Sequence, residues 1–250
     1  RQDILGVICT CLCKGGPLLG RGTPSAGGSF DVACWGAGAT VTAVDSVMAE
    51  SSGRACVLSR PPGHHATPYR PMGFCLFNNA AIAARYAQAI HGVEKVLIVD
   101  WDVHHGNGTQ DIFWEDDSVF FFSTHQSPHY PGTGAREDIG QGKGTGYTLN
   151  IPLRAGTPAN SHRQAFSDAL KQIENGFHPD LVIVSAGFDS HRGDPLGGLM
   201  LEDEDFAEMT KDVLKIAEKH SDGRVVSVLE GGYNLDLLGG SVRSHLSALL

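Results

Sequence analysis

Six short apolar runs recur along the chain and constrain its fold more than any other feature. Each run is almost continuous in apolar residues, as strands are when both faces of a sheet are covered. The predicted strands are residues 55–59, 95–100, 118–123, 147–153, 181–186 and 224–229. Helical periodicity predicts intervening helices at 79–90 with Asn78 as the cap, at 161–175 stopped by Gly176, and at about 203–219.

This alternation of strands and helices predicts an α/β fold with three layers, in which helices flank a mostly parallel β-sheet. The 250 residues, 41% of them apolar, suffice for a real core. Because no repeat, linker or change of composition interrupts the chain, we expect one domain over residues 1–250. The segment 124–146, with six glycines and no periodicity, is expected to be a functional loop.

Charge and cysteine usage restrict the possible partners. The formal net charge of -9 argues against direct binding of nucleic acid, which needs clustered Lys and Arg. The apolar run at 4–13 is too short to span a bilayer, and we predict no membrane segment. Six cysteines without a CxxC pair indicate free thiols in a reducing compartment. We therefore expect a cytoplasmic protein, or a nuclear one in a eukaryote, and predict no oligomeric state.

The two ends of the chain resemble cut ends. The sequence begins without Met and stops on an apolar, helix-like segment that lacks a cap. We expect a fragment truncated at both ends, in which a lost targeting segment would be invisible.

Polar clusters follow five of the predicted strands. In open parallel sheets the carboxyl ends of the strands form one edge where ligands bind, so distant clusters can converge there. The clusters are RPPGHH (60–65), DWDVHH (100–105), STH (123–125), AGFDSH (186–191) and EGGY (230–233).

A metal site is the chemistry that these clusters favour. In an extended chain, residues i and i+2 project to one side, so Asp102 and His104 can present an oxygen and a nitrogen to one cation. Asp189, alone among apolar neighbours, is the best third ligand. Two Asp and one His leave a position free for water, as in catalytic zinc sites. A surface turn is the alternative for this D-x-H pattern.

Four further side chains fit catalysis beside such a cation. His64 and His65 follow a stiff Pro-Pro-Gly turn and suit proton transfer, with Asp100 orienting one ring. Tyr233, after two glycines, can donate to a developing oxyanion. The plainer alternatives are a solvent-facing turn for the histidines and a packed turn residue for the tyrosine.

Five motifs, taken together, resemble the zinc-dependent histone deacetylase family in the arginase/deacetylase fold. From about Gly22 onward they appear in the family's order, whereas residues 1–21 do not resemble its N-terminal segment. The variants RPPGHHA, Asn107 and EGGY within them resemble the class II branch and the bacterial histone deacetylase-like amidohydrolases. The motifs are RPPGHHA (60–66), GFCLFNNAAIAA (73–84), VDWDVHHGNGTQ (99–110), SAGFDSHRGDPLGG (185–198) and LEGGYNL (229–235).

The resemblance implies a role for each candidate residue. It implies one catalytic Zn²⁺ on Asp102, His104 and Asp189, with Tyr233 polarising the acetyl carbonyl. It implies His65 as the general base, His64 as an electrostatic or acid partner, and Asp100 supporting His64. At the substrate tunnel it implies Phe74 and Tyr130 as walls, the Gly73 carbonyl as an acceptor and Leu196 at the rim. A potassium ion would lie near Asp100, Asp102, His104 and Ser123.

The expected activity is that of a hydrolase, a zinc-dependent deacetylase that releases acetate from acetyl-lysine side chains in proteins. One alternative keeps the amidohydrolase chemistry on acetylpolyamines or other small acetylated amines, although the apolar Leu196 tilts the choice toward acyl-lysine. The other alternative is an inert, truncated metal-binding module.

Overall fold

The computed structural model describes residues 23–49 and 53–250. The atypical segment 1–21, the apolar run 4–13 and the cysteines in it lie outside the described residues, so the single-domain prediction is untested over its full length. The helices are α2 Ser29–Ala49, α3 Asn79–His91, α4 Asn107–Phe113, α5 Ala159–Glu174, α6 Asp203–His220 and α7 Leu235–Leu249, with a 3-10 turn at Gly142–Gly144. The strands are β1 Arg54–Val57, β2 Val96–Asp100, β3 Val119–Gln126, β4 Thr148–Leu153, β5 Leu181–Ala186 and β6 Val225–Leu229.

The described strands form one six-stranded sheet in the order β1-β6-β5-β2-β3-β4, and every pair is parallel. The prediction of a mostly parallel sheet is therefore confirmed, and within the described residues the sheet is entirely parallel. All six predicted strands are present, within a few residues of their expected bounds. β3 is longer than expected: it pairs with β4 as far as Gln126, so the STH cluster lies inside the strand rather than after it.

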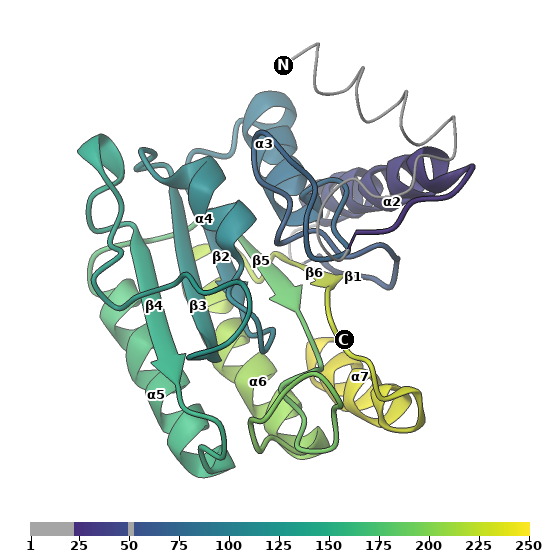
Figure 1. Ribbon diagram of the computed structural model, residues 1–250. Coiled ribbons are helices and arrows are strands. Elements are labelled where there is room, and N and C mark those ends of the chain that lie inside the picture. Colours follow the sequence, from purple (N-terminus) through teal and green to yellow (C-terminus); the bar gives the residue numbers. More distant parts are fainter. Residues whose placement is uncertain (1–22, 50–52) are drawn as a thin grey trace.

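Helices cover both faces of the sheet, which confirms three layers (Figure 1). Along β2, Val96 and Ile98 face the layer of α2, α3 and α4, while Leu97 and Val99 face α5, α6 and α7. The two helical layers bury the central strands β2, β5 and β6 on both faces, which is why their apolar runs are nearly continuous. Phe166 of α5 lies in the core between the sheet and the layer of α5, α6 and α7.

Helices α2 and α4 were not predicted, and α7 was expected only as a helix-like segment at the end of the chain, each for a physical reason. α2 is rich in Gly and Ala and shows little periodicity, α4 has only seven residues, and α7 carries two adjacent glycines. By length and composition alone α2 could cross a membrane. Here its buried residues, among them Val44 and Val47, pack with α3 and β1 in the core on that face of the sheet.

The predicted helix at 79–90 is present as α3, and Asn78 caps it by accepting from the Ala81 N–H at 2.9 Å. The helical periodicity predicted one apolar face made of Ile82, Ala83, Tyr86, Ala87 and Ile90, and that prediction is wrong at Ile90. Ile90 is 63% exposed, and small alanines such as Ala80 and Ala84 make the contact with the core instead. The alanines allow α3 to lie close against the sheet.

His245 of α7 connects two layers and supplies a test of the fold. Its ring nitrogens lie 2.7 Å from Thr210 Oγ1 on α6 and 2.8 Å from Ser227 Oγ on β6, and burial lowers its pKa to about 4. Below pH 6.5 the unfolded chain therefore takes up a proton that the folded chain excludes, so stability falls as pH falls toward 4.

We predict that His245→Gln makes unfolding stability less dependent on pH. The wild-type chain should lose about 2 kcal/mol more than the variant between pH 7.5 and pH 5, as expected for a histidine whose pKa falls to about 4 in the folded chain. Urea unfolding at the two pH values measures the difference. An equal loss in both proteins would show that His245 does not titrate as its burial requires.

Candidate active site

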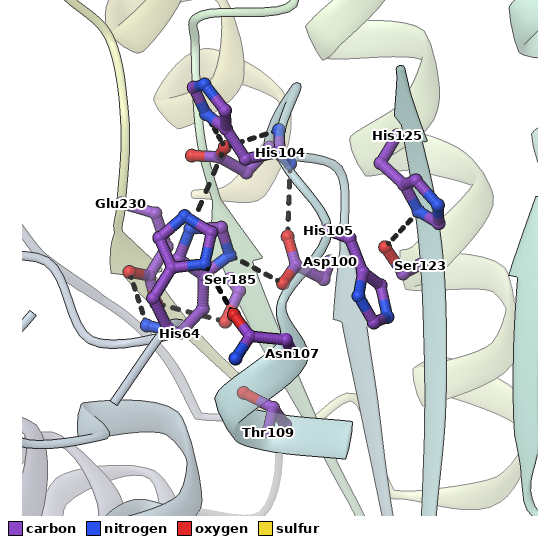
Figure 2. A network of polar contacts seen from close by, with 12 residues as sticks. His64, Asp100, His104, His105, Asn107, Thr109, Ser123, His125, Ser185 and Glu230 are labelled. Carbon is purple, nitrogen blue, oxygen red and sulfur yellow. Dashed lines mark hydrogen bonds and ion pairs between the residues drawn. The ribbon is translucent and has the colours of Figure 1, made fainter. Parts of the chain in front are cut away.

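The polar clusters after β2, β5 and β6 meet at one edge of the sheet. β2 and β6 both adjoin β5, and Asp100, the last residue of β2, is in register with Ser185 of β5 and Ser123 of β3. Figure 2 shows the resulting network, with Glu230 and Asp100 on opposite sides of His64. The convergence that the topology predicted is therefore present.

Asp102, His104 and Asp189 form a buried group whose potential ligand atoms all lie within 4.8 Å of one another. The Nδ1 atom of His104 is 3.0 Å from Asp102 Oδ1 and 3.1 Å from Asp189 Oδ2. Backbone N–H groups fix both carboxylates: Val103 donates to Asp189 Oδ1, and Gly231 donates to Asp102 Oδ2. Within the described residues, no other set of His, Cys, Asp and Glu meets this criterion.

The electrostatics of this group fit a cation. Both carboxylates are fully buried, and burial together with the negative charge of Asp102 raises the pKa of Asp189 to about 7. Two buried carboxylates this close repel each other unless a positive charge lies between them. Oxygen and imidazole nitrogen donors are suitable ligands for zinc, and three of them leave a position open.

Gly231 makes this approach of β6 to the carboxylates possible. A Cβ at this position would overlap the Asp189 and Asp102 carboxylates. The backbone N–H of Gly231 instead reaches Asp102 Oδ2 at 2.7 Å. The glycine in EGGY is thus required for the close approach of two strand ends.

The two tandem histidines have different environments. His64 Nδ1 donates to Asp100 Oδ2 at 2.9 Å, and His64 Nε2 lies 3.7 Å from Asp102 Oδ1. Burial by itself lowers the pKa of His64, but the charges of Asp102 and Asp100 outweigh it and raise the pKa well above 6.5. The structure therefore places Asp100 beside His64 and favours an imidazolium there.

His65 is held by a neutral partner instead. Its Nδ1 lies 2.9 Å from Asn107 Oδ1, an oxygen that only accepts, so the proton belongs on Nδ1 and the Nε2 lone pair is free. Burial and the positive charge of His64 lower the pKa of His65 well below 6.5. The ring centroids of His65 and His104 are 5.9 Å apart. A neutral imidazole thus lies next to the Asp-His-Asp group.

Tyr233 lies near the same group, on the turn after β6. Burial, followed by the charges of Asp102 and Asp189, raises the pKa of its phenol well above the usual value. The phenol therefore keeps its proton and can donate a hydrogen bond. Asp194, which is 7% exposed, holds this turn by accepting from the Tyr233 N–H at 2.7 Å and the Asn234 N–H at 3.2 Å.

Three of the four predicted substrate contacts, Phe74, Tyr130 and Gly73, lie beside the histidine pair or Tyr233. Phe74 is 43% exposed with its ring centroid 5.9 Å from that of Tyr233, and Tyr130 is 40% exposed with its centroid 5.1 Å from that of His65. Gly73 packs on His65 so closely that a Cβ would overlap its ring. Leu196 is 41% exposed, and its main-chain oxygen accepts from His129 Nε2 at 2.8 Å.

A second polar network anchors the long loop that carries Tyr130. His125 Nε2 donates to the Gly134 oxygen at 3.0 Å, and Ser123 Oγ lies 2.9 Å from His125 Nδ1. His105 Nδ1 lies 2.8 Å from Thr133 Oγ1. In Figure 2 His64 lies on one side of Asp100, and the side chains of His105, Ser123 and His125 lie on the other. The loop is therefore attached to the ends of β2 and β3.

Sequence reasoning missed several residues that this site uses. Asn107 and Glu230 were noted only as motif variants, and Asp194 and Arg60 were not singled out. Glu230 is fully buried, as is Asp100, and both are acidic residues at the carboxyl end of a predicted strand. That shared position is the signal that could have identified Glu230.

Comparison with known proteins gives a consistent result. The family model "Histone deacetylase domain" matches residues 11–249. Chloroplastic histone deacetylase 14 of Arabidopsis thaliana is 48% identical over 86% of this chain and 52% of its own length. The histone deacetylase-like amidohydrolase of Pseudomonas aeruginosa is 44% identical, with coverages of 88% and 58%. Polyamine deacetylase HDAC10 of Danio rerio is also 44% identical, with coverages of 86% and 32%.

A solved structure agrees with these relatives. The crystal structure of the HDA15 HD domain superposes with a TM-score of 0.92 at 37% identity, covering 100% of this chain and 70% of that one. The chain spans about half the length of two chloroplastic plant relatives that it matches. On the family match and these identities together, the chain belongs to the histone deacetylase family.

Proposed function

We propose that the chain is a zinc-dependent amidohydrolase that deacetylates acetyl-lysine side chains of proteins or peptides. One observation carries the proposal: the Asp-His-Asp group, the histidine pair and Tyr233 lie together at the carboxyl ends of four neighbouring strands, β1, β6, β5 and β2. Membership of the histone deacetylase family supports the same chemistry. Zinc would be held by Asp102, His104 and Asp189.

When bound, zinc would supply Lewis-acid polarisation of the amide carbonyl and make nearby water more acidic. His65 then acts as the general base. Its Nδ1–H is held by Asn107, so its Nε2 accepts the proton of the attacking water. His64, an imidazolium beside Asp100, adds positive charge next to the reacting carbonyl.

Tyr233 stabilises the charge that develops on the carbonyl oxygen. Because its pKa is raised, the phenol remains a hydrogen-bond donor throughout the neutral pH range. The proton taken up by His65 passes to the leaving nitrogen as the carbon–nitrogen bond breaks. The products are acetate and a free amine.

The substrate class rests on the rim of the site. The exposed aromatic rings of Phe74 and Tyr130 suit the methylene chain of a lysine, and Leu196 offers no charge to a second ammonium group. The name of one relative, polyamine deacetylase HDAC10 of Danio rerio, favours small acetylated amines as the second candidate. A potassium ion near Asp100, Asp102, His104 and Ser123 stays a prediction.

We predict that Zn²⁺ stabilises the folded chain through Asp189. For a site with micromolar affinity, a free Zn²⁺ concentration 100-fold above the Kd adds about 2.7 kcal/mol to the free energy of unfolding. Asp189→Asn should abolish this gain, measured by thermal unfolding with and without Zn²⁺. Asp168→Asn, which changes an exposed carboxylate on α5, is the matched control and should retain it. An equal gain in Asp189→Asn would contradict the assigned ligand.

We predict that Tyr233→Phe lowers kcat by about 10²-fold, the usual effect of losing one oxyanion donor, while zinc stabilises the variant as it does the wild type. Release of fluorophore from an acetyl-lysine peptide measures the rate, with and without a chelator. The wild-type rate should depend on zinc.

Acetylspermidine, assayed in parallel, separates the candidate functions. Turnover of the peptide supports the proposal, and turnover of acetylspermidine alone supports the second candidate. If the folded, zinc-loaded chain hydrolyses neither substrate, both enzymatic assignments are wrong and an inert metal-binding module remains.

A further inference from the structure

The turns that carry the histidine pair and Tyr233 follow neighbouring strands. β1 and β6 are parallel and in register, with Val57 opposite Val228. One turn contains Arg60, His64 and His65, and the other contains Glu230 and Tyr233. The relative position of the general base and the oxyanion donor therefore depends on how these two turns contact each other.

Glu230 holds the histidine turn from the β6 side. Its Oε2 accepts from the Gly63 N–H at 2.6 Å and from the His64 N–H at 3.1 Å, while Oε1 accepts from Ser185 Oγ at 3.1 Å. The carboxylate is fully buried and takes no part in the proposed reaction. Buried backbone N–H groups need acceptors, and a carboxylate makes shorter and stronger bonds to them than a neutral group does.

Arg60 makes the reciprocal contact, from the histidine turn to the tyrosine turn. Its Nη2 donates to the Gly232 main-chain oxygen at 2.8 Å, and its Cζ lies 5.6 Å from the centroid of the Tyr233 ring. The guanidinium thus contacts the residue before Tyr233 and the face of its ring. Asp194 holds the same turn from the opposite side through the Tyr233 N–H.

We propose that Glu230 and Arg60 are positioning residues that lock the histidine turn and the tyrosine turn to each other, so that His65 and Tyr233 address one carbonyl. The inference rests on the proposed deacetylase function. A misplacement of about 1 Å in such a pair can cost on the order of 10²-fold in rate. The contacts therefore affect catalysis without either residue touching the substrate.

Glu230→Gln tests the first contact. The amide oxygen can still accept from both N–H groups, but it replaces two charge-assisted bonds with weaker neutral ones, and its NH2 group can no longer accept from Ser185 Oγ. We expect kcat to fall about 30-fold while KM stays within about twofold and the zinc content is unchanged. Glu208→Gln, an exposed change on α6, is the matched control and should keep wild-type kcat.

Arg60→Met tests the second contact and keeps most of the aliphatic stem. Because Arg60 is exposed, the variant is expected to fold even where Glu230→Gln does not. We expect kcat to fall about 10-fold with little change in KM. Arg85→Met is the matched control, because Arg85 lies 4.6 Å over the Phe113 ring in an equivalent cation–π contact remote from Tyr233.

Double variants distinguish a positioning role from a purely structural one. In each of them Arg60 or Glu230 is changed together with the residue that it positions. Arg60→Met should cause no further loss in a Tyr233→Phe background, and Glu230→Gln none in a His65→Ala background. A trifluoroacetyl-lysine peptide, with its more electrophilic carbonyl, keeps the slow variants measurable. Independent, multiplicative losses in these backgrounds would overturn the proposal, as would unchanged kcat in folded Glu230→Gln or Arg60→Met.

The wild-type protein distinguishes failure of this inference from failure of the proposed function. If the wild type hydrolyses the peptide and the variants keep its kcat, only the positioning role is wrong. If the zinc-loaded wild type shows no turnover, the proposed deacetylase function fails first. If Glu230→Gln does not fold, the result for Arg60→Met decides.

Discussion

The burial of two carboxylates beside one imidazole is the constraint on which the rest of this structure depends. Asp102 and Asp189 are fully removed from solvent, 87 positions apart in the chain, and both lie next to His104 Nδ1. Such a cluster is costly unless a cation occupies it, and it forms only because parallel strands bring their carboxyl ends to one edge. The continuous apolar sequence of β2, β5 and β6, the glycines that permit close approach, and the hydrogen bonds from backbone N–H groups all serve that placement.

The two adjacent histidines of this site have different pKa values because their surroundings differ. His64 and His65 are adjacent in sequence, yet His64 contacts the Asp100 carboxylate and His65 contacts the Asn107 amide. The charged partner keeps the pKa of His64 high, whereas burial and the charge of His64 keep the pKa of His65 low. A pair of identical side chains thus supplies one fixed positive charge and one neutral base. Groups whose pKa values are pushed apart in this way are typical of acid–base catalysis.

Much of this arrangement could be predicted from the sequence. The apolar runs that form buried strands, and their alternation with helices along the chain, are visible locally and together determine the fold class. The apolar runs predicted the sheet, and the polar residues after them predicted which side chains would meet. What was missed depends on contacts across elements. The exposure of Ile90 follows from how closely the alanines of α3 approach the sheet, and the extension of β3 through His125 follows from its pairing with β4. Likewise, the contacts of Glu230 and Arg60 require the neighbouring turn, which periodicity does not show.

The central claim is that one divalent cation is bound jointly by Asp102, His104 and Asp189. Anomalous diffraction at the zinc edge from crystals of the zinc-loaded chain tests it most directly. The account predicts a single strong peak about 2 Å from an oxygen of each aspartate and from the His104 ring nitrogen. A peak elsewhere, or one whose distance excludes the Asp189 carboxylate from bonding, would contradict it.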